Sequence, residues 1–267
     1  MSEHLARLRS ILSDIGPLAV AVSGGVDSMT LAVVAHQVLD NEARMLHAVS
    51  PAVPVEASER VSRYAQRMGW RLERIDAGEL TDPSYLANPH DRCFYCKTDL
   101  YATMSARVDC TLVSGTNGDD LGDYRPGLKA AAHHGVRHPF VEADMDKAAV
   151  RAVARELALP DLAQLPASPC LSSRVETGIP IDPGVLSAID RAEQLIRREL
   201  APKTARCRIR SESVVIELDP PSLAAMDTAT TAQLRQAIGA LLAAAGVSHP
   251  VTFEGYRMGS AFLRPAP

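Results

Sequence analysis

Apolar and polar positions in the first half of the chain predict strands separated by helices. Residues 18–22 form a continuous apolar run, Leu-Ala-Val-Ala-Val, which is typical of a strand covered on both faces. Residues 3–13 before it carry leucine and isoleucine at helical spacing. The same criteria predict further strands at 45–49, 71–75, 110–113 and 137–140, and helices at 29–39, 56–68, 97–107 and 147–157. This alternation predicts an α/β fold with a doubly wound parallel sheet.

The pattern changes after about residue 175. Residues 180–184 are rich in proline, aspartate and glycine, which is typical of a linker, and a long amphipathic helix is expected at 185–200. The remaining chain predicts strands at 205–210, 214–218 and 251–253 and a helix at 231–245. We therefore expect a doubly wound domain over residues 1–175 and a smaller C-terminal α+β domain over residues 176–267.

The net charge and the length of the apolar runs limit which partners the protein is expected to bind. The 267 residues carry a net charge of -4, so no global positive field attracts nucleic acid. No apolar run approaches the roughly 20 residues that a membrane-spanning helix needs. The first residues lack the basic and then apolar order of a signal peptide. These features predict a cytoplasmic protein that binds neither nucleic acid nor membrane.

A glycine-rich segment joins the first predicted strand to the next helix, and its residues are Ser23, Gly24, Gly25, Val26, Asp27 and Ser28. Backbone N–H groups at a helix N-terminus bind phosphate, and the glycines let the backbone approach it closely. Asp27 would repel phosphate unless Mg²⁺ lies between them. The segment is neither a Walker A loop nor a dinucleotide fingerprint, and without a loop lysine we expect it to bind departing pyrophosphate. The alternative is a tight turn with helix-capping serines.

A second polar segment follows the predicted strand at 110–113. Because ligands bind outside the carboxyl ends of strands in open α/β sheets, we expect this segment to face the glycine-rich one. Asp119 and Asp123 could hold Mg²⁺ together with Asp27. The predicted nucleotide contacts are Gly115, Thr116, Asn117 and Arg125, of which Arg125 could also pair with a substrate carboxylate. The alternative is a solvated acidic loop in which aspartate forms turns.

Five cysteines, an odd number without an export signal, favour reduced thiols over a disulfide framework. Cys93 and Cys96 form a Cys-x2-Cys pair and Cys170 lies in a second segment; we expect both segments to be loops. The pair alone is compatible with a redox pair, half a zinc site or part of an iron–sulfur site. Three thiolates could bind three irons of a 4Fe-4S cluster and leave the fourth open to sulfide; alternatively, Cys170 gives up its own sulfur. Cys110 and Cys207 are expected to be small buried hydrophobes.

The glycine-rich segment resembles the PP-loop of the N-type ATP pyrophosphatases, whose fold is of the adenine nucleotide alpha hydrolase type. This superfamily includes GMP synthetase, NAD synthetase and tRNA thiolation enzymes. The resemblance implies that ATP is cleaved between its α- and β-phosphates, so that AMP is placed on the substrate and pyrophosphate is released. It also implies that adenine binds beside the second strand, near Ser50.

Further segments resemble the LarE family, in the same order over nearly the whole chain: residues 92–97, 115–127, 169–174 and 253–260. The resemblance implies sulfur insertion into pyridinium-3,5-biscarboxylic acid mononucleotide, on the path to the nickel-pincer cofactor, by a homo-oligomer. Some family members use only the cysteine that matches Cys170, which they sacrifice. Others carry three cysteines and resemble cluster-dependent enzymes. This sequence has Cys93, Cys96 and Cys170, which favours the cluster.

Arg206, Arg208 and Arg210 alternate along a predicted strand and therefore project from one face. Like charges on one face require an anion or solvent, so the alternative to a ligand is an exposed polar face. Arg206 and Arg208 resemble the Arg-x-Arg pair near the substrate phosphate in LarE proteins. Arg174 and Glu193 could also face the cleft between the domains. The predicted catalytic residues are Asp27, Cys170 and Arg174, and the predicted substrate-binding residues are Arg206, Arg208 and Glu193.

These features predict a reaction in two stages. ATP, held with Mg²⁺, adenylates a carboxylate of a small-molecule nucleotide substrate, and a sulfur nucleophile then displaces AMP to give a thiocarboxylate. Three alternatives remain. A tRNA thiolase would need a basic surface, an ammonia-using synthetase would not need the three cysteines, and a non-catalytic nucleotide-binding regulator would release no pyrophosphate.

Overall fold

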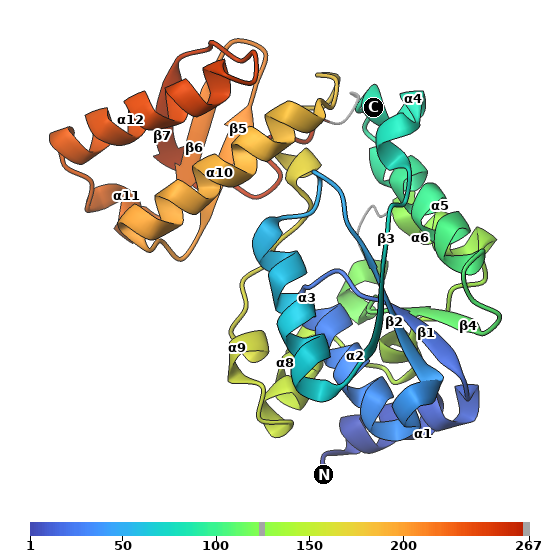
Figure 1. Cartoon of the computed structure of the whole chain (residues 1–267). Coiled ribbons are helices and arrows are strands. Elements are labelled where there is room, and N and C mark those ends of the chain that lie inside the picture. The colour runs from blue at the N-terminus through green and yellow to red at the C-terminus, as the bar shows by residue number, and fades with distance from the viewer. Residues whose placement is uncertain (123–125, 264–267) are drawn as a thin grey trace. The chain divides into compact units, whose positions relative to one another are not determined.

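The computed structural model describes residues 1–122 and 126–263 and divides into two compact units (Figure 1). Unit 1 comprises Met1–Glu79 and Arg92–Ser168, and unit 2 comprises Leu80–Asp91 and the chain from Pro169 onward. The segment Leu80–Asp91 therefore groups with the C-terminal half, whereas the sequence pattern places it in the first domain. Asn88 is one of the residues that join this segment to unit 2, because its buried amide donates to the carbonyls of Glu176 (2.9 Å) and Ile179 (2.8 Å).

A parallel four-stranded sheet forms the centre of unit 1. Its strands are β1 (Leu18–Ala21), β2 (Ala43–Ala48), β3 (Arg71–Ile75) and β4 (Thr111–Ser114), in the order β3-β2-β1-β4. The chain runs outward from β1 through β2 to β3 and then returns to the other side of β1. The predicted α/β class and doubly wound sheet are confirmed. In such a sheet the reversal of strand order marks the ligand-binding edge, here at the carboxyl ends of β1 and β4.

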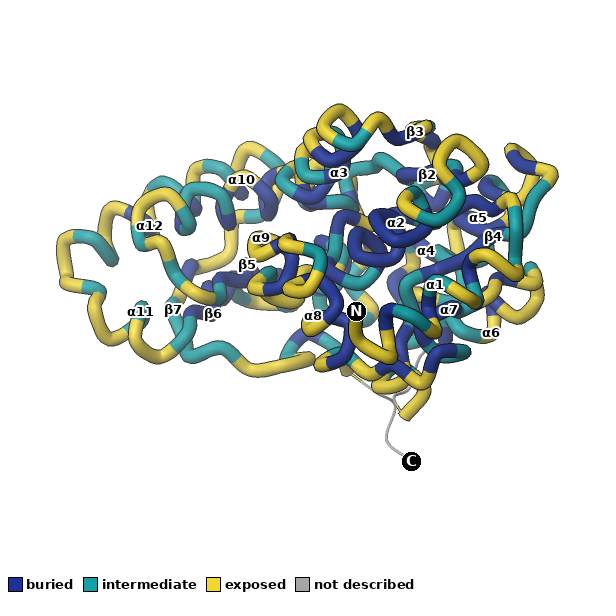
Figure 2. The backbone as a smooth tube through the Cα atoms, turned by 90° about the horizontal axis from the view of Figure 1, so that it is seen from below, coloured by how far each residue is buried: buried dark blue, intermediate teal, exposed yellow. Residues whose placement is uncertain are grey.

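Helices cover both faces of this sheet (Figure 1). One core contains Leu18 and Val20 of β1, and the other contains Ala19, so adjacent side chains of the strand point to opposite cores. The first core is shared with α1 (Glu3–Ile15), α2 (Val26–Leu39), α3 (Val55–Met68) and α8 (Lys147–Glu156), and the second with α5 (Arg92–Ser105) and α6 (Pro126–His133). Most of α2 is buried, as its dark blue path in Figure 2 shows, so the core fixes its N-terminus.

Two details of unit 1 differ from the expectation. The strand expected at 137–140 is replaced by a single bridge between Arg137 and Val113, followed by α7 (Pro139–Glu142). Pro139 has no N–H for a strand ladder, and its fixed φ suits the first position of a helix. The helix expected to begin at residue 97 begins at Arg92 instead, so the Cys-x2-Cys pair lies in a helix and not in a loop. Both expectations are wrong.

Unit 2 contains a three-stranded sheet. Strand β5 (Ala205–Ile209) pairs antiparallel with β6 (Val214–Leu218), and β6 pairs parallel with β7 (Val251–Gly255). Helices α10 (Pro183–Leu200) and α12 (Thr228–Ala243) pack against each other and against this sheet. The shorter elements of the chain are η1 (Asp40–Glu42), η2 (Glu79–Thr81), α4 (Pro83–Leu86), η3 (Gly118–Leu121), α9 (Pro160–Ala163), η4 (Leu171–Arg174) and α11 (Pro220–Ala224). Among the described residues, no helix is long and apolar enough to cross a membrane.

Candidate functional site

The turn between β1 and α2 leaves the first turn of that helix without a side-chain cap. Gly25 is the N-cap residue and no side-chain cap bond is made there, so the serines do not cap the helix as the alternative interpretation requires. The N–H of Gly25 itself donates to Ser23 Oγ at 3.4 Å. Instead, Ser28 Oγ accepts from the N–H of Ser23 and lies 3.0 Å from Ser23 Oγ. These bonds close the turn on itself. The arrangement suits an anion, because uncapped N–H groups at a helix N-terminus attract phosphate.

Gly24 lies close against α3. Its φ of +82° lies in the left-handed region, and a Cβ there would come within 2.7 Å of the Ala57 carbonyl oxygen. Arg60, on the same helix, donates to the Gly24 carbonyl at 2.7 Å. The structure therefore requires glycine at this position, and α3 holds the backbone of the turn in place.

His47 links the same turn to α3 from inside the sheet. Its side chain is fully buried, with Nδ1 2.8 Å from the Val22 carbonyl and Nε2 2.9 Å from Ser58 Oγ. Because a carbonyl can only accept, Nδ1 carries the proton and Nε2 accepts from the Ser58 hydroxyl. Burial lowers the pKa of His47, which keeps the imidazole neutral. No sequence pattern identified this residue.

The segment after β4 packs directly against the turn between β1 and α2. A Cβ on Gly115 would lie 2.7 Å from the backbone nitrogen of Ser28, so only glycine allows this approach. Asn117, which is buried, donates from Nδ2 to Asp27 Oδ1 at 3.2 Å. Thr116 Oγ1 lies 3.1 Å from the hydroxyl of Ser114. The structure thus brings together the two segments that the sequence analysis singled out.

Asp119 and Asp120, in the segment after β4, both accept hydrogen bonds from backbone N–H groups. Asn117 forms a capping box with Asp120, because Asn117 Oδ1 accepts from the N–H of Asp119 and Asp120 Oδ2 accepts from the N–H of Asn117, both at 3.1 Å. Asp119 is exposed and accepts from the backbone N–H of Lys147 at 3.2 Å. Asp123 and Arg125, two predicted ligands, lie outside the described residues. Within 1–122 and 126–263, no three His, Cys, Asp or Glu side chains gather as a metal site.

Lys147 was not among the predicted site residues. This residue begins α8, and its Nζ forms an ion pair with Asp27 Oδ2 across 120 positions of the chain. Asp27 thus accepts from Asn117 on one carboxylate oxygen and from Lys147 on the other. The local pattern around Lys147 predicts only a helix start, with Asp146 as its N-cap. Its partner could not be identified without the fold.

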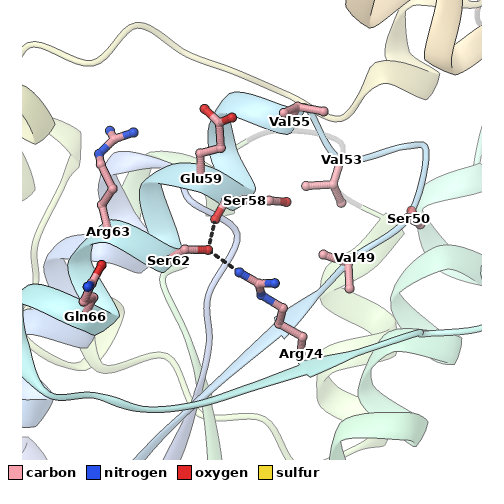
Figure 3. Close-up of a pocket in the computed structure, with 10 residues that line it drawn as sticks. All are labelled: Val49, Ser50, Val53, Val55, Ser58, Glu59, Ser62, Arg63, Gln66 and Arg74. Atoms are coloured by element: carbon pink, nitrogen blue, oxygen red, sulfur yellow. Dashed lines mark hydrogen bonds between the residues drawn. The ribbon is translucent and has the colours of Figure 1, made fainter.

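A pocket of about 790 Å³ lies beside α3 at the carboxyl ends of β2 and β3 (Figure 3). Val49, Ser50 and Val53 come from the segment after β2, and Arg74 comes from β3. Arg74 donates to Ser62 Oγ of α3 at 2.6 Å, which ties the edge strand to the helix. Ser50, the predicted nucleotide contact beside the second strand, therefore lines a hollow that is apolar on one side and polar on the other.

The five cysteines occupy different environments, and none forms a disulfide. Cys93 is exposed and Cys96 half-buried, and their spacing in the first turns of α5 places them on neighbouring helical positions. Cys170 is half-buried and belongs to unit 2, whereas the pair belongs to unit 1. Cys207 is fully buried and burial raises the pKa of its thiol, as expected for a small core residue. Cys110 is only half-buried.

The backbone around Cys170 is held by a buried arginine. Arg174 donates from Nη1 to the carbonyls of Pro169 (2.7 Å) and Cys170 (3.2 Å), and from Nε and Nη2 to the carboxylate of Glu193 (2.8 and 3.1 Å). Neither Arg174 nor Glu193 has any exposed side-chain surface. These two side chains bind each other inside unit 2. Their contacts with substrate remain predictions.

The alternating arginines meet a carboxylate on the neighbouring strand. Arg206 lies opposite Glu217, and Arg208 donates from Nε to Glu217 Oε2 at 3.0 Å. Arg210 approaches the same carboxylate at 3.6 Å. Arg206 and Arg208 are buried, so the alternative of an exposed polar face is wrong. Burial lowers the pKa of Arg206 to about 10, and Arg208 also donates to the Ser173 carbonyl at 2.9 Å, next to the Cys170 segment.

Comparison with known proteins places the chain in a family. No protein-family model matches it. It is 37% identical over 227 residues to an uncharacterized protein of Synechocystis sp., with 84% of each chain covered. It is 31% identical over 219 residues to the pyridinium-3,5-bisthiocarboxylic acid mononucleotide synthase of Lactiplantibacillus plantarum, over 80% of this chain and 78% of the synthase. The chain belongs to the LarE-type family.

The predicted site residues of this LarE-type chain fall into two groups. In unit 1, Asn117 donates to Asp27 at the N-terminus of α2, where Gly115 allows the close approach, and Asp119 accepts from the backbone N–H of Lys147. In unit 2, Arg174 binds Glu193, and both Arg174 and Arg208 donate to backbone carbonyls of the segment that carries Cys170. The supporting residues that sequence reasoning missed are His47, Arg60, Lys147, Glu217 and Tyr85, whose hydroxyl lies 2.6 Å from Ser172 Oγ.

Proposed function

We propose that this protein is an ATP-dependent sulfur transferase that forms thiocarboxylate on pyridinium-3,5-biscarboxylic acid mononucleotide for nickel-pincer cofactor synthesis. The observation that carries the proposal is the similarity to the synthase of Lactiplantibacillus plantarum over 80% of the chain. Two features support it. Adenylation needs a phosphate site, which the turn at the N-terminus of α2 in unit 1 would supply. Sulfur delivery needs a thiol, which Cys170 in unit 2 would supply from a backbone held by Arg174. We further propose a cytoplasmic homo-oligomer that binds this small-molecule nucleotide and neither nucleic acid nor membrane.

The first half of the proposed reaction uses the chemistry of unit 1. The phosphates of ATP bind at Ser23–Ser28, and the adenosine extends toward Ser50 and its pocket. Asp27 and Asp119, beside the turn, offer the hard oxygen ligands that Mg²⁺ prefers, and the ion would neutralise phosphate charge. A substrate carboxylate oxygen attacks the α-phosphorus and pyrophosphate leaves. The product of this half is an acyl-adenylate, whose AMP is a good leaving group.

The second half needs a sulfur nucleophile. We propose that Cys93, Cys96 and Cys170 bind a 4Fe-4S cluster; the exposure of Cys93 and the helical spacing of the pair suit thiolate ligation, and a bound cluster would supply a transferable sulfide. In the alternative, the Cys170 thiolate attacks the acyl carbon and expels AMP. Loss of the Cys170 α-proton then breaks its Cβ–S bond, leaving dehydroalanine in the chain and the sulfur on the product. Arg174 holds the Cys170 carbonyl in either case.

The proposal is tested with anaerobically purified protein, ATP, MgCl₂ and the biscarboxylic mononucleotide. We expect release of pyrophosphate and AMP that depends on the mononucleotide, together with a product whose mass shows sulfur in place of oxygen. Omitting the mononucleotide is the control for ATP hydrolysis alone. Binding of ATP without any release of pyrophosphate would contradict the proposal and favour a nucleotide-binding regulator, whereas turnover with ammonia but no thiolated product would favour a synthetase.

A further inference from the structure

The phosphate-binding turn has no lysine of its own, yet the fold brings one to it. Lys147 Nζ forms an ion pair with Oδ2 of Asp27, and Asp27 lies in the first turn of α2. The N–H groups of this turn are the ones that attract phosphate. An ammonium group therefore lies at the edge of the proposed phosphate site, supplied by a helix 120 positions further along the chain.

The backbone of Lys147 is fixed by the segment after β4. Its N–H donates to Asp119 Oδ2 at 3.2 Å, and the N–H of Gly118 donates to the Met145 carbonyl at 2.8 Å. Asp146 caps the helix by accepting from the N–H of Ala149 at 2.7 Å. The side chain, in contrast, is 34% exposed. Its flexible stem can therefore redirect the ammonium group while its Cα stays in place.

The partner of Lys147 is the carboxylate that the proposed Mg²⁺ site would use. A divalent ion on Asp27 would compete with the ammonium of Lys147 for this carboxylate, whose other oxygen accepts from Asn117. Phosphates at the N-terminus of α2 would then offer Lys147 a replacement anion. Lysine binds phosphate as a mobile point charge, which suits such an exchange of partners.

We propose that Lys147 is the phosphate-binding lysine of this chain. It pairs with Asp27 in the nucleotide-free protein and contacts the β- and γ-phosphates of ATP, and then the departing pyrophosphate, when MgATP binds. The inference rests on the proposed function, because it assumes ATP at the Ser23–Ser28 turn. It assigns a direct role to a residue outside that turn, where a positive charge stabilises the negative charge that grows on the leaving group.

The test compares the binding of three ligands, ATP, pyrophosphate and AMP, in MgCl₂ by isothermal titration calorimetry. Lys147→Met should weaken the binding of ATP and of pyrophosphate about 10- to 100-fold, the equivalent of one charged hydrogen bond. AMP lacks the outer phosphates, so its affinity should stay within about twofold of the wild type, which also shows that the variant is folded. Lys147→Arg retains the charge and should recover most of the affinity. Lys129→Met, which removes an exposed lysine of α6, is the matched control.

Three outcomes overturn the inference in distinguishable ways. Wild-type protein that binds ATP, with Lys147→Met binding it equally well, rejects the role of Lys147 and leaves the proposed function intact. Wild-type protein that binds none of the three ligands rejects the proposed function and the inference with it. An equal loss of ATP and AMP affinity in Lys147→Met would also reject the inference, because it would mean that the ion pair with Asp27 only shapes the turn.

Discussion

Arg174 and Glu193 form a fully buried ion pair through two hydrogen bonds, of 2.8 and 3.1 Å, and the same guanidinium binds the carbonyl of Cys170. Burial alone would raise the pKa of Glu193, but the charge and hydrogen bonds of Arg174, together with the charges of Arg206 and Arg197, outweigh burial and lower the pKa. The carboxylate therefore stays ionised and anchors the arginine. Through Glu193 and Arg174, helix α10 holds the backbone of Cys170, the residue predicted to deliver sulfur.

Removing the charge of Glu193 should destabilise the protein strongly. In Glu193→Gln the guanidinium of Arg174 stays buried without its counter-charge, which costs about 3–5 kcal/mol in comparable buried pairs. Urea unfolding would measure this as a lower free energy of unfolding. Glu199→Gln on the same helix is the matched control, because Glu199 pairs with Arg198 at the surface and such pairs contribute little. Equal stability of both variants would show that the buried pair does not anchor the fold.

Gly24→Ala should impair ATP binding through the backbone. A Cβ would meet the Ala57 carbonyl oxygen at 2.7 Å, so the turn has to move away from α3. We expect at least about a tenfold loss of ATP affinity, which calorimetry would measure. Gly16→Ala is the control, because Gly16 also has a positive φ (+72°) but nothing lies within 4 Å of its Cβ position. Both variants carry a backbone cost of about 1–3 kcal/mol, so only a difference in ATP binding supports the role of Gly24.

Strands and turns that depend on residues close together in the sequence could be predicted from it. The strands at 71–75 and 214–218 have the same bounds in the structure, because alternation and apolar runs determine which face of a strand is buried. The glycine-rich turn was recognisable because its close approach to α3 and to the segment after β4 requires glycine at positions 24 and 115. The segment at 137–140 was not, because one β-bridge cannot outweigh the preference of Pro139 for the start of a helix.

Pairing between distant charges escaped prediction. Arg174 and Arg208 look like surface or ligand-binding residues in the sequence, since buried arginine is uncommon without a partner. Their partners, Glu193 and Glu217, lie on other elements, and only the fold brings them together. Lys147 is the extreme case, with 120 positions between it and Asp27. The sequence therefore indicates which segments lie together but not which charges neutralise each other within them.

The buried imidazole of His47 should make stability depend on pH. Burial lowers its pKa below the ordinary value of 6.5, so between these two values the unfolded state binds a proton that the folded state does not. Its contribution is fully present above about pH 6.5 and is lost as the pH falls towards the folded pKa. We expect the wild type to lose more unfolding free energy than His47→Gln between pH 7 and pH 5.

The measurement is the difference between these two proteins, obtained from urea unfolding at each pH. Burial also lowers the pKa of His138, which adds a contribution of the same sign to both proteins and cancels in the difference. Parallel pH curves would mean that His47 is as easily protonated in the folded protein as in the unfolded chain. That result would contradict its assignment as a neutral donor to the Val22 carbonyl.

The cysteines separate the two proposed sources of sulfur. A cluster bound by Cys93, Cys96 and Cys170 should give about four irons and four acid-labile sulfides per chain after anaerobic purification. Cys93→Ala should lose both, because it removes one of three proposed protein ligands. Cys207→Ala is the control, since Cys207 is fully buried in unit 2 with its thiol pKa raised, and it should keep the iron.

Sacrificial use of the Cys170 sulfur would give a different set of results. Protein without iron under strict anaerobiosis, whose Cys170 peptide loses the mass of its sulfur after one turnover with ATP and substrate, would establish sacrificial chemistry. Arg174 then gains importance, because its bond to the Cys170 carbonyl fixes the backbone from which the sulfur departs. In that case Cys93→Ala should leave the yield of a single turnover unchanged, whereas Cys170→Ala should abolish it. A cluster-dependent protein should lose turnover in both variants.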